Sequence, residues 1–591
     1  MIGYYCALSA QKQPTLGAQL LRKPRVSLAL LAIGGVPLAL CGCAYCPTYD
    51  SVAGKADRVA QEAHETVQAD RQSRLLRAAR QLKTPGDPDS EERIRQELRA
   101  KYSDLNKLSL AEALRIATAY NRDLAGQRDS NTLSALSYLQ ARHLFDPRLS
   151  GAVSFLESWA KNTGVDTEAH SFGSTGTLGV DYLTTLGTHV RTNLSTSNTR
   201  TESSGGTGGA ANASSASITV SQSLLRGAGR AVVREPLTQA ERNLVYRLRT
   251  FELFRQDFTI QAVSSFYGLV RDKQVITNNK QRFEQADFLY QRAQSLYRTN
   301  RAKELDVLQA EQERLQAENN LRDAEENYKD ALLSFKIFLG VPDDVTLDIR
   351  TDEYPEFRKV KVDPEKAVQL AYENRLDLST AAEQVEDAQR GVAIAHNGQL
   401  PDFALALSAS SNAAGGARFQ SQVFNNHAGS AGVTFTAPLD RLDQHVAAEQ
   451  ARLNLDQAQR GHKLFRDTLA SDVRRQLRNL LRIEQSMVVQ LKIVTASQKR
   501  LANAEYLFHQ AQRTSRDVVD AQIDLLNARN QDIQFVVDHA IARLSLLRAL
   551  GLLSVNAEGV AQPSDLFGPL EHRVLPELPP LKADDGLEEE P

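Results

Sequence analysis

The sequence predicts a mainly α-helical fold with a smaller β-strand contribution, built from two copies of one helix–strands–long helix–helix unit. Three observations indicate it: a long internal repeat, helical periodicity over very long stretches without proline, and alternating apolar and polar residues at the same place in both copies. Hydrophobic residues make up 42% of the 591 positions and charged residues 24%, which is ordinary for a folded protein. The net charge of −2 gives no reason to expect nucleic-acid binding.

The N-terminal segment has the pattern of a secretory signal. Basic residues precede the short apolar stretch Val26–Leu40, and small residues and cysteines follow it. Gly42 before Cys43 resembles a bacterial lipobox, so we expect residues 1–42 to be a lipoprotein signal peptide and Cys43 to be lipidated. An ordinary cleaved signal peptide is the alternative interpretation. With Cys43 lipidated, Cys46 has no partner, which excludes a disulfide framework and a cysteine-based metal site.

The internal repeat is visible in three pairs of segments. The pairs are separated by 254, 215 and 211 positions, so the first copy holds 254 − 215 = 39 additional residues among its strands. A repeat of this length indicates internal duplication and pseudo-symmetry rather than a short-period solenoid. The aligned segments are Ala113–Ala117 with Ala367–Ala371, Ile218–Leu224 with Val433–Leu439, and Ala293–Tyr297 with Ala504–Phe508.

After the predicted signal peptide at 1–42, the chain divides into four further parts. An anchor and helical extension is expected at 43–106, the first repeat at 107–350, the second at 351–553, and a flexible tail at 554–591. Within the repeats the expected elements are strands at 148–222 and 402–438, long helices at 236–300 and 441–512, and returning helices at 303–339 and 514–550.

Each long helix is expected to pack along its whole length. From Leu237 to Asn300 the chain has no proline, and apolar residues recur at spacings of three and four, which is typical of a helix with one buried stripe. The helices predicted at Ala113–Leu144 and Lys303–Leu339 would lie end to end beside it. Gly340 and its repeat equivalent Gly551 have the place of C-cap glycines. Helices this long need partners for their apolar stripes.

The strands alternate as the strands of a membrane barrel do. Phe403, Leu405 and Leu407, for example, are separated by small residues, so one face is apolar and the other small or polar. A soluble sandwich shows the same alternation. The additional residues contain two further alternating segments, which gives six strands; if they form only an external loop, four remain. Neither number closes a useful barrel, and open strand edges are not tolerated in lipid, so the chain is expected to oligomerise.

Taken in order, these features resemble the TolC-like outer membrane efflux protein family. The resemblance covers nearly everything from Leu108 to Leu553. It rests on the duplication and on four short motifs: Leu110–Leu114, Leu224–Gly227 after a strand, Leu305–Ala310 and Asp517–Ala521.

The resemblance implies a homotrimer with a transmembrane β-barrel in the bacterial outer membrane and an α-helical tunnel through the periplasm. The implied function is that of an outer-membrane channel in a tripartite efflux or type I secretion system, with passive export. A periplasmic adaptor and an inner-membrane pump would be its partners, and outer-membrane lipid would surround the barrel.

The resemblance also implies a periplasmic gate in the second repeat. The matching positions are Phe508, Arg513, Asp517 and Asp520, and Phe508 replaces the tyrosine of the family. Asp517 and Asp520 are three apart and share a helix face, so a trimer would hold two rings of three carboxylates. Capping of the helix start is the alternative role for Asp517.

Four charged residues near the two helix turns are candidates for contact with the adaptor: Arg298, Arg301, Asp306 and Arg516. For Asp306, helix capping is the other role considered. For the arginines, the alternative is a solvated helix tip.

No motif for catalysis is present, and we expect no enzyme activity, no cofactor and no metal site. The rival functional class is a lipid-anchored periplasmic coiled-coil adaptor or scaffold, which explains the helices and the signal but not the strands that recur in both copies. The sequence leaves drugs, metals and proteins open as cargo.

Overall fold

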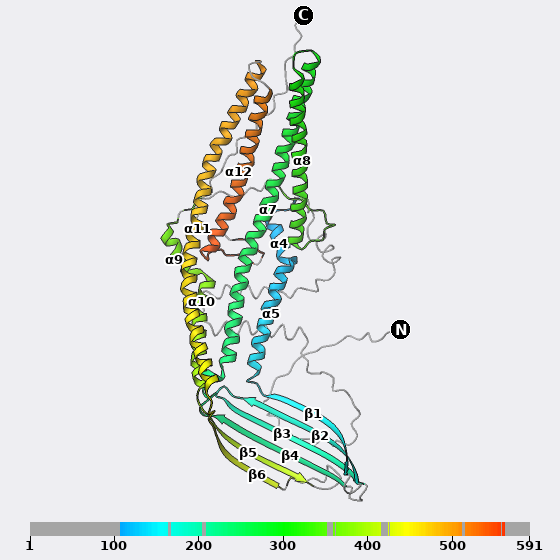
Figure 1. Cartoon of the computed structure of the whole chain (residues 1–591), viewed down its shortest axis with the longest axis vertical. Coiled ribbons are helices and arrows are strands. Elements are labelled where there is room, and N and C mark those ends of the chain that lie inside the picture. Colours follow the sequence, from blue (N-terminus) through cyan, green and yellow to red (C-terminus); the bar gives the residue numbers. More distant parts are fainter. Residues whose placement is uncertain are drawn as a thin grey trace, which may run out of the picture.

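The computed structural model describes residues 107–162, 167–203, 209–350, 359–360, 362–414, 424, 426–510, 515–556 and 558–561. These residues form long helices that extend from one end of a single β-sheet (Figure 1). The predicted signal peptide 1–42, the lipidation site Cys43 and the extension 43–106 lie outside the described residues. The predicted tail lies outside them from residue 562 onward.

Both repeats follow the same order of elements. The first contains α4 (Leu110–Tyr120), α5 (Arg122–His143), β1 (Arg148–Asn162), β2 (Thr167–Leu183), β3 (Thr188–Ser203), β4 (Gly209–Ser223), the short α6 (Arg230–Val233), α7 (Glu235–Arg298) and α8 (Glu304–Leu339). The second contains α9 (Pro364–Asn374), α10 (Leu376–Gly398), β5 (Asp402–Ala414), β6 (Asn426–Thr436), α11 (Leu442–His509) and α12 (Ser515–Ala549). Helices α7 and α11 have 64 and 68 residues. At about 1.5 Å per residue, each is roughly 100 Å long.

The single helix predicted at Ala113–Leu144 is wrong, because the chain breaks at Asn121 into α4 and α5. Asn121 has an extended backbone, and its side-chain oxygen accepts a hydrogen bond from the Leu124 N–H at 2.8 Å, which caps α5. Its amide group donates to the carbonyl oxygen of Phe338 on α8 at 2.7 Å. The second repeat breaks in the same way at Arg375, between α9 and α10.

The six strands form one antiparallel sheet in chain order from β1 to β6. Strand β4 of the first repeat pairs with β5 of the second, with Val220 opposite Leu407, so the sheet joins the two repeats. The additional residues of the first repeat form β2 and β3, joined by a short turn before Thr188. The alternative of an external loop with four strands is therefore wrong.

The helices lie side by side in two levels. Next to the sheet their order is α5, α7, α10 and α11; farther from it the order is α8, α7, α12 and α11. The apolar core has two equivalent parts where these levels meet. Phe266, Leu269 and Leu339 lie in the first part, and their equivalents 211 positions later, Leu477, Leu480 and Leu550, lie in the second. None of the described helices combines the length and the apolar character that a membrane-crossing helix needs.

Candidate functional site

The two faces of the sheet differ sharply in polarity. The pairing register brings the apolar positions of all six strands onto one face, where Phe155, for example, is 70% exposed. The other face carries mainly serine, threonine, glycine and alanine. An exposed apolar face this large requires an apolar environment. Its members include Leu149, Val153, Phe155, Leu178, Tyr182, Leu194, Ile218, Leu407, Val433 and Phe435.

The described chain has two open edges on opposite sides. Strand β1 and helices α5 and α8 form one edge, and strand β6 and helix α11 form the other. Within the described residues, β1 and β6 each pair along one side only. Both edges also expose large apolar side chains: Leu133 on α5, Leu305, Leu308, Leu315 and Ile337 on α8, and Leu442, Leu453, Leu464 and Val488 on α11.

The turn between α7 and α8 lies at the end of the molecule farthest from the sheet (Figure 1). Asn300 has a positive φ of 54°, and the Arg301 N–H donates back to the Leu296 carbonyl at 2.8 Å, which closes the last turn of α7. Arg298 and Arg301 are exposed on this tip. The Asp306 carboxylate accepts the Lys303 N–H at 3.1 Å, so it caps α8.

Three of the predicted gate residues, Phe508, Asp517 and Asp520, lie on α11 and α12 of the second repeat, whose far ends lie at the same end of the molecule (Figure 1). Asp517 is half-buried in the first turn of α12, whereas Asp520 and Arg516 are exposed. Arg513 lies outside the described residues. Phe508, near the end of α11, has the guanidinium carbon of Arg292 4.8 Å from its ring centroid.

This cation–π contact joins α7 to α11 and was missed by sequence reasoning. No local pattern could have identified Arg292, because its partner lies in the other repeat. Phe508 has no hydroxyl group for the hydrogen bond that the family tyrosine offers, but its ring supplies a different contact between the two helical hairpins.

Close to the sheet, charged groups join α7 to α10. Arg249 on α7 donates to Glu383 on α10 at 2.6 Å, and Arg242 on α7 is 3.7 Å from Asp387 on α10. The Tyr246 hydroxyl donates to Asp387 at 2.7 Å, and burial together with this hydrogen bond raises the pKa of Tyr246. The contact between the two repeats at this level therefore depends on ion pairs and not on apolar packing alone.

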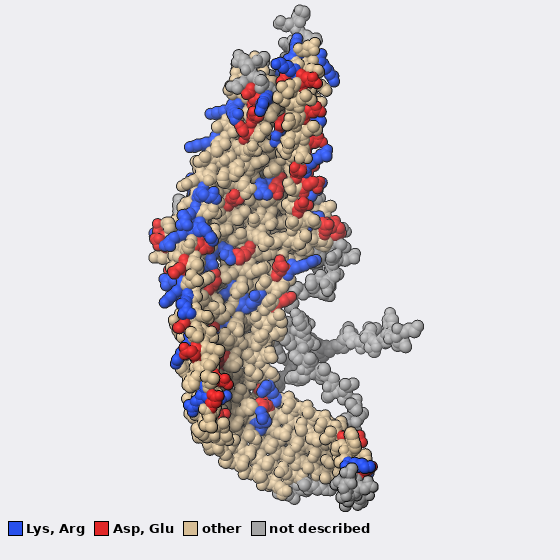
Figure 2. Space-filling model, viewed as in Figure 1, with Lys and Arg blue, Asp and Glu red and all other residues tan. Residues whose placement is uncertain are grey.

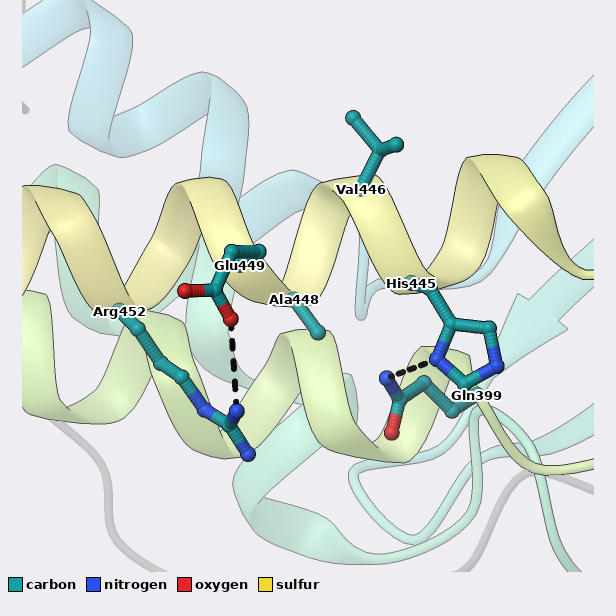
Figure 3. A pocket seen from close by; sticks show the side chains of 6 residues that line it. All are labelled: Gln399, His445, Val446, Ala448, Glu449 and Arg452. Atoms are coloured by element: carbon teal, nitrogen blue, oxygen red, sulfur yellow. Dashed lines mark hydrogen bonds and ion pairs between the residues drawn. The ribbon is translucent and has the colours of Figure 1, made fainter.

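A shallow groove of about 520 Å³ lies where α10 meets the start of α11 (Figure 3). Gln399 Nε2 lies 3.5 Å from His445 Nδ1, and Arg452 is 3.4 Å from Glu449. The polar groups of the groove thus pair with one another. The contact between Gln399 and His445 ties the end of α10 to α11, the Arg452–Glu449 pair lies within α11, and neither converges on a ligand position.

Residues 367–552 match the family model for the outer membrane efflux protein. No curated protein matches the chain. Among solved structures, the outer-membrane channel OprN has a TM-score of 0.58 at 14% identity, covering 79% of this chain and 94% of OprN. The Campylobacter jejuni CmeC outer membrane channel has a TM-score of 0.57 at 15% identity, covering 77% of this chain and 87% of CmeC.

The open state of the Neisseria gonorrhoeae MtrE outer membrane channel has a TM-score of 0.56 at 12% identity, covering 75% of this chain and 89% of MtrE. The resemblance inferred from the sequence is thus confirmed: residues 367–552 match the outer membrane efflux protein family, and the described chain has the fold of these outer membrane channels.

Proposed function

We propose that this chain is the outer-membrane channel component of a tripartite efflux or type I secretion system, a passive duct from the periplasm to the exterior. The observation that carries the proposal is the pair of open edges on a chain whose sheet has one apolar face. A scaffold protein has no need for either feature.

The two edges suit a closed ring of copies. Strand β6 of one copy would pair with β1 of the next, and α11 would cover the exposed apolar side chains of α5 and α8. Such head-to-tail contacts close by rotation. Three copies, the number that the family resemblance implies, would contribute three times six strands. Closed barrels of about 16–18 strands leave an aqueous channel.

The polarity of the sheet suits insertion in the outer membrane. Its apolar face would meet lipid, and its polar face would line the lumen. Charged side chains are spread over the helices, whereas most of the sheet surface visible in Figure 2 carries none apart from small groups at its ends, and a surface with few charges suits a membrane span. Lipidation at Cys43 would anchor the chain to the same membrane, and the helices would extend into the periplasm.

The far tip would form the periplasmic gate. Asp517 and Asp520 would form two rings of carboxylates that attract cations, and Arg513 and Phe508 would complete the gate. The contact of Phe508 with Arg292 would hold the hairpins of one copy together there. Arg298, Arg301, Asp306 and Arg516 would meet the periplasmic adaptor, which connects to the inner-membrane pump.

The assembly can be tested at an open edge. Leu464 on α11 is exposed in the single chain, so Leu464→Glu would place a carboxylate in the contact between copies. We expect outer-membrane fractions of the parent to give a heat-modifiable trimer on gels, and Leu464→Glu to lose it. Lys463→Glu, at the neighbouring exposed position, is the matched control and should retain the trimer. A parent chain found only as soluble monomer would contradict the proposal.

A further inference from the structure

Among the described residues, the polar face of the sheet carries charge at one level only. Among the described strand residues that share this face, the charged or titratable ones are Arg148, Asp181, His189, Arg191 and Asp402. All five lie at the end of the sheet next to the helices. The rest of the face consists almost entirely of serine, threonine, glycine, alanine and asparagine, so this level dominates the electrostatic potential along it.

Three of these residues form one row across three strands. The register places Asp181 directly between Arg148 on β1 and Arg191 on β3. Asp181 accepts hydrogen bonds from both guanidinium groups, each at 3.3 Å. His189 Nε2 lies 3.2 Å from the same carboxylate.

The row presents more positive than negative charge to a passing solute. The Asp181 side chain is 26% exposed, whereas those of Arg148 and Arg191 are 42% and 63% exposed. One carboxylate therefore lies between two guanidinium groups that are more exposed than it is, so the row carries a net positive charge. Asp402, the first residue of β5, supplies a second carboxylate two strands away from β3.

We propose that Arg148, Asp181 and Arg191 form a charge filter where the sheet meets the helices, which favours anionic solutes beside β1 to β3. The inference rests on the proposed function, because the polar face must line an aqueous lumen. The alternative is that the three side chains only tie the strands together.

The local potential can be measured with a cysteine probe. Thr219 lies directly opposite Arg191 on the same face, so Thr219→Cys places a thiol beside the filter. The assembled chain in lipid vesicles is treated with an anionic (sulfonatoethyl) and a cationic (trimethylammonioethyl) methanethiosulfonate. The ratio of their labelling rates is the readout, and the same chain without the added cysteine is the blank.

Removing the two positive charges should reverse the preference. Arg148→Gln with Arg191→Gln should lower the anionic-to-cationic rate ratio at least about threefold, because two charges are removed near the thiol. Asp181→Asn should raise it. Arg148→Lys with Arg191→Lys preserves charge and should leave the ratio unchanged, as should Arg200→Gln on the apolar face. If the double variant Arg148→Gln with Arg191→Gln does not assemble, the rise in the labelling ratio of Asp181→Asn still tests the proposed filter.

The labelling experiment distinguishes failure of the proposed charge filter from failure of the proposed channel function. If neither Arg148→Gln with Arg191→Gln nor Asp181→Asn changes the ratio of labelling rates, the proposed filter is wrong. The three side chains then only tie the strands together. Ile218→Cys points to the apolar face and should be protected by lipid. If Ile218→Cys were labelled as fast as Thr219→Cys, the aqueous lumen itself, and with it the proposed function, would fail.

Discussion

In the first repeat, Asn121 closes the break between α4 and α5 by donating to the Phe338 carbonyl at 2.7 Å; in the second, Arg375 reaches the Ala549 carbonyl at 3.4 Å. Asn121 and Arg375 are 254 positions apart, and the two carbonyls are 211 apart, so the same contact exists twice. A neutral amide makes it once and a buried guanidinium makes it the second time. Duplication has preserved the position of this contact, but not its chemistry.

The two parts of the core differ in the same way. The first contains neighbouring rings, with Phe266 and Phe335 centroids 6.5 Å apart, whereas their equivalents 211 positions later, Leu477 and Leu546, lie in the second. At these two positions the shared backbone arrangement therefore accepts an apolar aliphatic side chain in place of an aromatic ring.

The glycines that end the returning helices are alike in both repeats. Gly340 and Gly551 have φ values of +73° and +70°, and each lies against the backbone at the break in the opposite helix. A Cβ on Gly551 would lie 2.8 Å from Asn374 backbone atoms, and one on Gly340 would be closer still to the Tyr120 carbonyl. Here both conformation and space require glycine.

The largest effects are expected at these glycines. We expect Gly340→Ala to lower the free energy of unfolding by about 4 kcal/mol and Gly551→Ala by about 3 kcal/mol. Each substitution places a Cβ on a residue with a left-handed backbone conformation, and this Cβ also collides with the backbone of the opposite helix. Urea unfolding in detergent, followed by far-ultraviolet circular dichroism, measures both. Gly268→Ala in α7 is the control; it has no neighbour within 4 Å and should stabilise by about 0.5 kcal/mol. A loss at Gly340 no larger than at Gly268 would contradict this account.

Removing the duplicated contact at the helix breaks should lower the free energy of unfolding by less, and by different amounts in the two repeats. Arg375 is 7% exposed and holds Asp377 through its Nε at 2.9 Å, so Arg375→Ala leaves a carboxylate without its partner. We expect a loss of about 2 kcal/mol, against about 1 kcal/mol for Asn121→Ala, which removes a cap. Arg474→Ala breaks an exposed ion pair with Glu365 and should cost at most about 0.5 kcal/mol. Equal losses at all three positions would show that the burial of Arg375 does not matter.

Sequence reasoning reached the features that follow from local periodicity. The long helices and the apolar parity of each strand are of this kind, and the repeat is visible by comparing the sequence with itself. It missed what depends on contacts between distant segments. The break at Asn121 needs the Phe338 carbonyl, and the contact between Arg292 and Phe508 needs the other repeat. The row of Arg148, Asp181 and Arg191 is visible only once the register is known.

The smallest expected effect is a change in ion permeability, and it is expected at the helix tips, where the two repeats differ in sequence. Asp306 and Asp517 are equivalent, 211 positions apart, but the position equivalent to Asp520 is Gln309. Asp306 accepts the Lys303 N–H and serves its own helix, whereas Asp520 is exposed one turn into α12. At this pair of equivalent positions, only the second repeat therefore presents a charge to solvent.

If Asp520 lines the proposed gate, Asp520→Asn should lower the potassium-to-chloride permeability ratio about twofold in planar bilayers, because a ring of carboxylates loses its charge. Asp306→Asn is the matched control. It removes the same charge from the other tip, retains an oxygen that can cap α8, and should leave the ratio unchanged. An equal fall in both variants would mean that the tips act through their summed charge, and that the gate does not belong to the second repeat.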